Sequence, residues 1–285
     1  MKKHFSKIQL KNQLIGYSFF LPWLIGFVAI TLYPVIFSIC MSFSAVSITT
    51  HGIVLDWEGL KYYNDAWNID ANFKINLTAA MTFILGLTPI VLVFSLIFAM
   101  FLNQNFRGRF IYRTIFFFPV VIMSGPVVSN LLLNNSLDFS ESAPSIYIFL
   151  RTLPSVLRKP CLFVLDNIEL CFWMLGVQLL IYLVGLQKVG DDIYEAASID
   201  GAGSWEKFWK ITLPNLKAFI LLNAIYTVME LSNYSESAIN QQIKNSVFWP
   251  TKVYSFASAL SWIYFLCIIA VMLIVYLLYV IFARR

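Results

Sequence analysis

The sequence predicts an all-α integral membrane protein with six membrane-spanning helices. Three observations support this fold class: 59% of the 285 residues are hydrophobic, only 12% are charged, and long apolar stretches recur along the chain. Soluble domains carry about 25% charged residues, and one compact core could not hide this much apolar surface from water. The composition therefore excludes a disordered chain, a nucleic-acid-binding protein and a disulfide-rich secreted scaffold.

Six apolar stretches are long enough to cross the hydrocarbon core, which is about 30 Å thick and needs about 20 helical residues. The first is too long for the core of a cleaved signal peptide and lacks a following small-residue cleavage site, so we expect it to remain in the mature protein. The predicted spans cover residues 14–44, 77–102, 110–133, 168–187, 216–236 and 259–283.

Helix-breaking residues lie inside two of these spans. The second span contains Gly86 and Pro89, and the third contains Pro119 followed by the Ser-Gly-Pro sequence at 124–126. Lipid tolerates lost backbone hydrogen bonds only where neighbouring helices or a water-filled cavity replace them. The breaks favour a channel or transporter over a simple anchor, although proline kinks also occur in purely structural membrane helices.

Basic residues flanking the spans predict the orientation of the chain. Six spans place both termini on one side, and loops rich in Lys and Arg stay in the cytoplasm. We therefore expect both termini to be cytoplasmic. The basic residues on that side are Lys2, Lys3, Lys7, Lys11, Arg107, Arg109, Arg113, Lys188, Lys207, Lys210, Lys217, Arg284 and Arg285.

Four cysteines lie in or beside apolar stretches and lack the spacing of metal ligands. They are Cys40, Cys161, Cys171 and Cys267. We interpret them as small hydrophobic residues, with a disulfide between Cys161 and Cys171 as the alternative. No metal site is expected.

The loop at 188–215 has the pattern of a docking surface. Asp191 and Asp192 are suited to the N-cap and first turn of a short helix over about 193–199, which the Gly-Ala-Gly sequence at 201–203 ends. Ser204 is suited to cap a second, amphipathic helix, and Pro214 opens the fifth span. The first helix presents two alanines, which would let a partner approach closely.

This loop resembles the cytoplasmic EAA loop of permease subunits in binding-protein-dependent ABC importers. The Glu-Ala-Ala triplet, the glycine, the isoleucine and the Leu-Pro pair all occur at the family's spacing, just before the penultimate span. The resemblance covers about 72–283, and the first span resembles the extra first helix of the maltose-type first permease subunit. It assigns coupling to an ATPase to Glu195, Ala196, Ala197, Asp200, Gly201, Ile211, Leu213 and Pro214.

The resemblance implies a type I ABC importer permease fold: a MetI-like core at 72–283 preceded by a tail, extra helix and external loop at 1–71. Such a subunit forms half of a transmembrane pathway. The chain contains no P-loop, so ATP and Mg²⁺ would bind to a partner ATPase and this chain would need no cofactor. The implied partners are a second homologous permease, an ATPase dimer, an extracellular solute-binding protein and a carbohydrate, in a bacterial or archaeal cell membrane.

Polar residues within the spans are the candidates for the substrate pathway. An ionisable residue inside a span normally faces a cavity or a partner, so Glu230 leads the group. Three interpretations of Glu230 remain open: a substrate contact, a hydrogen bond to a neighbouring helix, and a position at the exposed outer rim. The other candidates are Asn223, Tyr226, Asn233 and Tyr234 in the fifth span, Gln178 and Tyr182 in the fourth, and Asn130 in the third; Thr227 shares the stripe.

Two segments depart from the common sugar-permease pattern, namely 134–167 and 232–250. They are reminiscent of the branch associated with plant-polysaccharide oligosaccharides such as rhamnogalacturonan fragments. The competing hypotheses are a permease for amino acids, phosphate or polyamines, a secondary transporter or channel acting alone, and an intramembrane enzyme. The enzyme would need a nucleophile and a base within the spans, yet His4 and His51 lie outside them and no G-x-S-x-G or H-E-x-x-H motif occurs.

Overall fold

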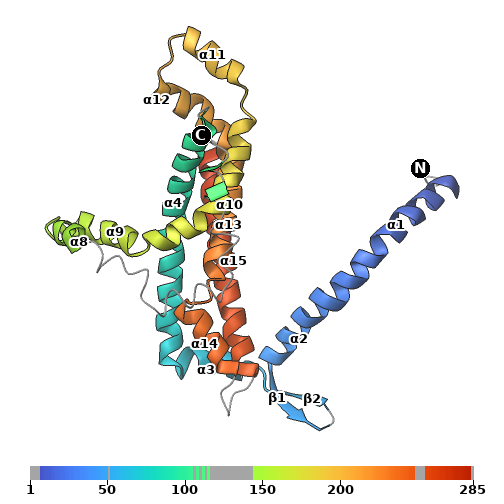
Figure 1. Ribbon diagram of the computed structural model, residues 1–285. Coiled ribbons are helices and arrows are strands. Elements are labelled where there is room, and N and C mark those ends of the chain that lie inside the picture. Colours follow the sequence, from blue (N-terminus) through green and yellow to red (C-terminus); the bar gives the residue numbers. More distant parts are fainter. Residues whose placement is uncertain are drawn as a thin grey trace. The chain divides into compact units, whose positions relative to one another are not determined.

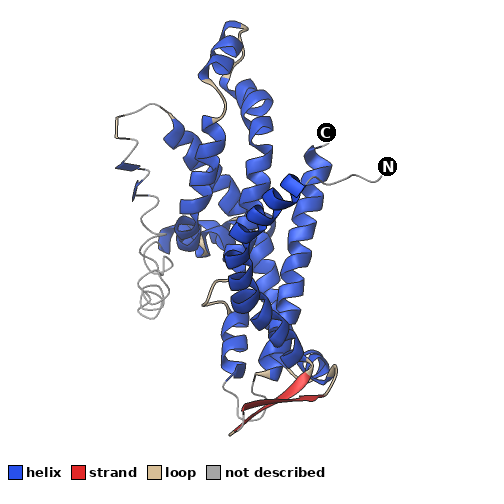
Figure 2. Ribbon diagram, turned by 90° about the vertical axis from the view of Figure 1, so that its right-hand side faces the viewer, coloured by secondary structure: helices blue, strands red, loops and turns tan. Residues whose placement is uncertain are grey.

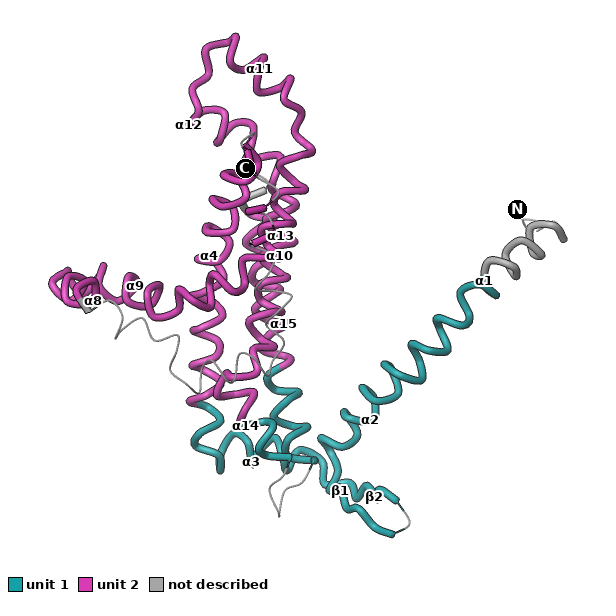
Figure 3. The backbone as a smooth tube through the Cα atoms, viewed as in Figure 1, with its two compact units in different colours: residues 1–74, 242–264 teal, residues 75–241, 265–285 magenta. Residues whose placement is uncertain are grey.

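The computed structural model describes residues 7–50, 52–104, 107–108, 111–112, 114–115, 144–247 and 254–283. Across these ranges the chain is helical apart from one two-stranded sheet (Figure 2). It forms two compact units (Figure 3). Unit 1 contains residues 1–74 and 242–264, and unit 2 contains residues 75–241 and 265–285.

Unit 1 begins with one long apolar helix made of three consecutive elements. These are α1 (Lys7–Phe27), the π-helical turn η1 (Val28–Leu32) and α2 (Tyr33–Ser42). Proline has no N–H and its ring crowds the preceding turn, so Pro34 would normally kink this helix. The wider π turn accommodates it, because the Tyr33 N–H bonds to the carbonyl of Val28, five residues back. The helix therefore continues through the proline.

A β-hairpin follows directly and is held by polar bonds within unit 1. Strands β1 (Ser44–Thr49) and β2 (Gly52–Trp57) pair antiparallel, with Thr49 opposite Gly52 at the tip. The short helix α3 (Lys61–Asn68) comes next, and the unit closes with the start of α15 (Ser255–Ala283). The Val46 N–H donates to Ser255 Oγ at 2.9 Å, and Trp262 Nε1 donates to Ser38 Oγ at 3.2 Å. These bonds join α15 to the hairpin and to α2.

Unit 2 is a helical bundle that includes α4 (Ala71–Asn103), α10 (Ile168–Gln187) and α13 (Leu213–Ser232) (Figure 1). Among the candidate membrane spans, α10 has the largest buried share. Polar side chains of α10 and α13 lie between two clusters of buried apolar residues, one formed by α4, α10, α13 and α15, the other by α4, α10 and α13. Gly185 on α10 permits close packing, because a Cβ there would lie 2.7 Å from the Leu216 side chain. The further elements of this unit are α8 (Pro144–Arg151), α9 (Ser155–Asp166), α11 (Asp191–Ile199), α12 (Ser204–Lys207), η2 (Phe208–Thr212) and the first part of α14 (Ala238–Val247).

Five of the predicted spans are confirmed as helices long and apolar enough to cross a membrane. They are Tyr17–Ser42, Ala71–Asn103, Ile168–Gln187, Ser204–Ser232 and Ser255–Ile281. The third predicted span, 110–133, lies almost wholly outside the described residues and stays a prediction, as does the break at Pro119 and 124–126. The all-α membrane fold class is thus confirmed, whereas the count of six spans stays a prediction.

Three sequence predictions need correction. Pro89 does not break the second span, since α4 runs continuously from Ala71 to Asn103 and a proline removes only one helix hydrogen bond. The fifth span ends at Ser232 rather than near 236, so residues 233–236 are not helical. All four cysteines are free, and therefore no disulfide joins Cys161 to Cys171.

Candidate functional site

The docking loop folds as two short helices at one end of unit 2 (Figure 1). Helix α11 begins at Asp191, two residues earlier than predicted, with Gly190 rather than Asp191 as its N-cap. Asp191 and Asp192 occupy the first turn, where their negative charges interact favourably with the helix dipole. Likewise α12 begins at Ser204 with Gly203 as its N-cap, so Ser204 does not cap it as expected.

A glycine turn ends α11 in the way that the sequence predicts. The Ala202 N–H bonds to the Ala197 carbonyl at 2.9 Å, and the Gly201 N–H bonds to the Ser198 carbonyl at 3.1 Å. This pair of bonds is the Schellman motif, which requires a left-handed residue after the helix. Gly201 provides it with φ +83°. A Cβ at this position would meet no atom within 4 Å, so the backbone angle alone requires glycine.

Two side-chain hydrogen bonds brace the loop from inside. Lys207 Nζ donates to Ser198 Oγ at 2.6 Å, which joins α12 to α11. The Tyr194 and Thr212 hydroxyls lie 2.9 Å apart and share a hydrogen bond, which joins α11 to the turn that opens α13. Sequence reasoning missed these four residues, because a pair of hydroxyls 18 positions apart carries no local signal.

The outer surface of the loop is open and partly apolar. Ile199 is 88% exposed and Trp205 is 72% exposed. Large apolar side chains so exposed favour an interaction surface. Of the predicted coupling residues, Glu195, Ala196, Asp200, Gly201 and Pro214 are exposed, whereas Ala197, Ile211 and Leu213 are half-buried.

The loop continues into the fifth span as a single helix, Ser204–Ser232. Pro214 would interrupt it, but the turn η2 is π-helical and the Leu213 N–H bonds to the carbonyl of Phe208, five residues back. The helix therefore connects the docking surface at Trp205 with Glu230 near its far end.

A polar cluster joins α10 to α13 between the two apolar clusters. Gln178 Nε2 donates to Glu230 Oε2 at 2.6 Å and to Thr227 Oγ1 at 3.3 Å. Asn223 Nδ2 donates to the Gln178 backbone carbonyl at 3.0 Å. Gln178, Asn223 and Thr227 are fully buried. The cluster thus places a carboxylate and two amides side by side inside the bundle.

Two acceptor oxygens of the cluster have no hydrogen-bond partner among the described residues. They are Gln178 Oε1 and Asn223 Oδ1. The hydroxyl of Tyr182, which is also buried, lies beside the Asn223 side chain. Buried polar atoms are normally satisfied by protein, water or a ligand. These oxygens can therefore accept hydrogen bonds from hydroxyl groups.

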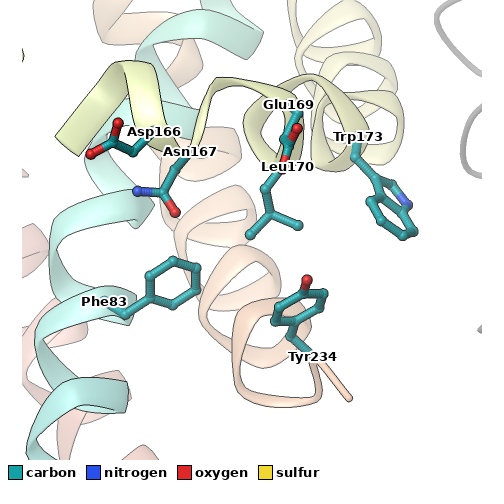
Figure 4. A pocket seen from close by; sticks show the side chains of 7 residues that line it. All are labelled: Phe83, Asp166, Asn167, Glu169, Leu170, Trp173 and Tyr234. Carbon is teal, nitrogen blue, oxygen red and sulfur yellow. The ribbon is translucent and has the colours of Figure 1, made fainter. Parts of the chain in front are cut away.

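A small pocket of about 110 Å³ lies beside the start of α10 (Figure 4). Its wall combines aromatic rings with carboxyl and amide groups, and the Tyr234 hydroxyl points toward the Glu169 and Leu170 side. Burial raises the pKa of Tyr234, and the negative charges of Glu236 and Glu169 add to the shift, so the phenol stays protonated. The lining residues are Phe83, Asp166, Asn167, Glu169, Leu170, Trp173 and Tyr234.

The predicted stripe of polar residues therefore divides. Asn223 and Glu230 belong to the polar cluster with Gln178 and Tyr182, while Tyr234 lines the pocket. Asn233 is exposed and donates to the Met229 carbonyl at 2.9 Å. Tyr226 is half-buried, and Asn130 lies outside the described residues. The sequence signal for the pocket is a pair of acids, Asp166 just before α10 and Glu169 in its first turn. Sequence reasoning missed them because it looked for polar residues further inside the spans.

Comparison with known proteins identifies the family. The family model described as "Binding-protein-dependent transport system inner membrane component" matches residues 76–285. The chain belongs to this family. It is therefore a multi-pass membrane protein of a transport system.

Two curated relatives and one solved structure show how far the similarity extends. The chain is 29% identical over 280 residues to "Probable ABC transporter permease protein YesP" of Bacillus subtilis, covering 92% of this chain and 89% of that protein. It is 32% identical over 240 residues to "Multiple sugar-binding transport system permease protein MsmF" of Streptococcus mutans, covering 75% and 81%. A bacterial alginate ABC transporter chain, crystallised in complex with a periplasmic protein, shares the fold with a TM-score of 0.66 at 17% identity, covering 93% and 94%.

Replacing Glu230 tests its hydrogen bond to Gln178. Glu230→Ala should lower the free energy of unfolding by about 1–3 kcal/mol, because the buried Gln178 N–H loses its carboxyl acceptor. Glu230→Gln keeps an acceptor oxygen and should lose less. Melting temperatures of the two purified variants test this. Equal melting temperatures for both variants and the wild type would show that the bond does not stabilise the bundle.

Replacing Gly201 tests the turn. Gly201→Val should be strained by about 1–2 kcal/mol at a positive φ, whereas Gly201→Asn should be tolerated. Gly203→Ser is the matched control, because Gly203 has an ordinary φ of −73° and serine is a good N-cap. We expect solute-dependent ATPase activity of the assembled transporter to fall only with valine. Wild-type activity of Gly201→Val would contradict the role of this turn.

Proposed function

We propose that this chain is the permease subunit of an ATP-driven importer for a carbohydrate and forms half of its translocation pathway. One observation carries the proposal: a single helix joins an exposed, braced docking loop to a buried polar cluster. Such a helix transmits displacement of the loop directly to the cluster. Alternating access needs a coupling of this kind between two discrete arrangements.

The docking loop would bind one subunit of a separate ATPase dimer. Helix α11 presents Glu195 and Ala196 to solvent, and Ile199 projects beside them. The small alanine face permits close approach of the partner, and Ile199 and Trp205 supply apolar area to bury. ATP and Mg²⁺ would be held by that ATPase, because this chain contains no P-loop. The permease itself would then carry out no covalent chemistry.

The polar cluster would contact the solute. A sugar presents many hydroxyl donors, and the Gln178 and Asn223 oxygens are buried acceptors in need of donors. Glu230 adds a carboxyl group beside them, which can accept a further hydrogen bond from a hydroxyl. The rings of Trp173 and Tyr234 in the nearby pocket suit the apolar faces of a sugar. Relatives named for arabinooligosaccharide and lactose transport support this class of solute over amino acids or phosphate.

The complete transporter would contain three further kinds of subunit. These are a second homologous permease, the ATPase dimer and an extracellular solute-binding protein. The family description and the periplasmic protein of the alginate complex support the last of these. Both termini and the docking loop would be cytoplasmic, in a bacterial or archaeal cell membrane. The basic residues around the loop support this orientation.

Reconstitution tests the proposal. The purified chain alone should hydrolyse no ATP, whereas the complex in liposomes should take up a labelled oligosaccharide only with ATP and binding protein. Glu230→Ala should weaken uptake while basal ATPase activity remains. A thermal-shift screen of the binding protein against oligosaccharides, amino acids, phosphate and polyamines identifies the class of solute that it binds. Uptake of an amino acid or polyamine but no sugar, or uptake without ATP, would contradict the proposal.

A further inference from the structure

The β1–β2 hairpin has one apolar face. Side chains alternate between the two faces of a strand, and the observed register sets like residues opposite each other. Val46 pairs with Leu55, and Ile48 pairs with Ile53. Trp57, opposite Ser44, extends this face toward α2. The other face carries Ala45, Ser47, Thr49, Val54 and Asp56.

Three large side chains of this apolar face have no covering layer among the described residues of unit 1, whereas Val46 and Leu55 are half-buried. Ile48 is 66% exposed, Ile53 is 54% exposed and Trp57 is 74% exposed. A two-stranded hairpin is at best marginally stable in water unless one face packs on something. An additional apolar phase or partner is therefore required on this side of the hairpin.

The hairpin directly follows α2, whose surface is also apolar and exposed. Strand β1 begins two residues after α2 ends, and Figure 1 shows the hairpin leaving directly from that end. The ring of Phe43, between the two elements, stacks on Trp57 with centroids 5.6 Å apart and planes 15° apart. Tyr33 and Ile36 on α2 are exposed on a helix apolar enough to cross a membrane. The hairpin is thus tethered where a span leaves the hydrocarbon.

The charged residues in and next to the hairpin lie at its base and on the face opposite the apolar one. Lys61 Nζ lies 2.8 Å from Glu58 Oε1, just beyond β2. This contact lowers the pKa of Glu58 and raises the pKa of Lys61, so both groups stay ionised. Within the described part of the two strands, Asp56 is the one charged residue, and it lies on the opposite face. An apolar face, a polar face and a tryptophan at the boundary are typical of an element that lies in the membrane interface.

We propose that the apolar face of the β1–β2 hairpin lies in the lipid interface of the leaflet where α2 ends. Ile48 and Ile53 insert between the headgroups and the acyl chains, and Trp57 sits at the boundary. The opposite face, with Ser47 and Val54, faces water. The hairpin thereby anchors the external end of the first span without contacting the solute or another subunit.

Cross-strand pairs on the two faces provide a matched test. Single cysteines at Ile48, Ile53, Ser47 or Val54, in a chain whose native cysteines are replaced by serine or alanine, would carry an environment-sensitive fluorophore. The labelled complex is reconstituted in liposomes that contain phosphatidylcholine with a nitroxide high on the acyl chain. Labels at 48 and 53 should be quenched roughly threefold more than labels at 47 and 54, since the two pairs point to opposite faces.

The result should be the same before and after addition of the binding protein. Equal lipid quenching of the two faces would overturn the proposal. Protection that develops at 48 and 53 only when the binding protein is added would assign this face to that protein instead. Protection from aqueous iodide without lipid quenching would assign it to another subunit. Similar quenching of the labels at 48 and 53 shows that the result does not come from misfolding of one variant.

Discussion

The hydrogen bond from Gln178 to Glu230 is the interaction around which unit 2 is organised. Inside a bilayer, polar groups must find partners within the protein, and this bond pairs the Gln178 N–H with the Glu230 carboxyl on the facing helix. Asn223 and Thr227 complete the link between α10 and α13. Clusters of buried apolar residues flank this layer. The polar layer thus fixes which faces of α10 and α13 meet.

Continuity of the helix Ser204–Ser232 links that polar layer to the docking loop. A proline two residues after a π turn occurs twice, at Pro34 after η1 and at Pro214 after η2. In both places the wide turn absorbs the proline and the helix proceeds. For Ser204–Ser232, the consequence is that the docking loop and Glu230 belong to one element. The Tyr194–Thr212 and Lys207–Ser198 bonds extend this rigid element to α11.

Local patterns in the sequence predict the elements well and their contacts poorly. Hydrophobicity located five described spans, and the Gly-Ala-Gly sequence located the turn at Gly201, because both depend on neighbouring residues. The unbroken α4 was mispredicted, since the packing around Pro89 decides whether a kink develops. The cross-helix partner of Glu230, the brace at Tyr194 and the pocket at Trp173 depend on which faces meet. The two hydrogen bonds join residues 18 and 52 positions apart, and the pocket combines residues from Phe83 to Tyr234.

Distance measurements between spin labels test whether the loop and the fifth span move as one body. Labels at Ile193 on α11 and Met229 on α13 occupy exposed positions. In the reconstituted complex, their separation should be the same without nucleotide and with ATP trapped. The separation between Met229 and the equivalent position of the partner permease should change between these states. A change in the Ile193–Met229 distance as large as the change between subunits would show that η2 is a hinge, and would contradict direct coupling.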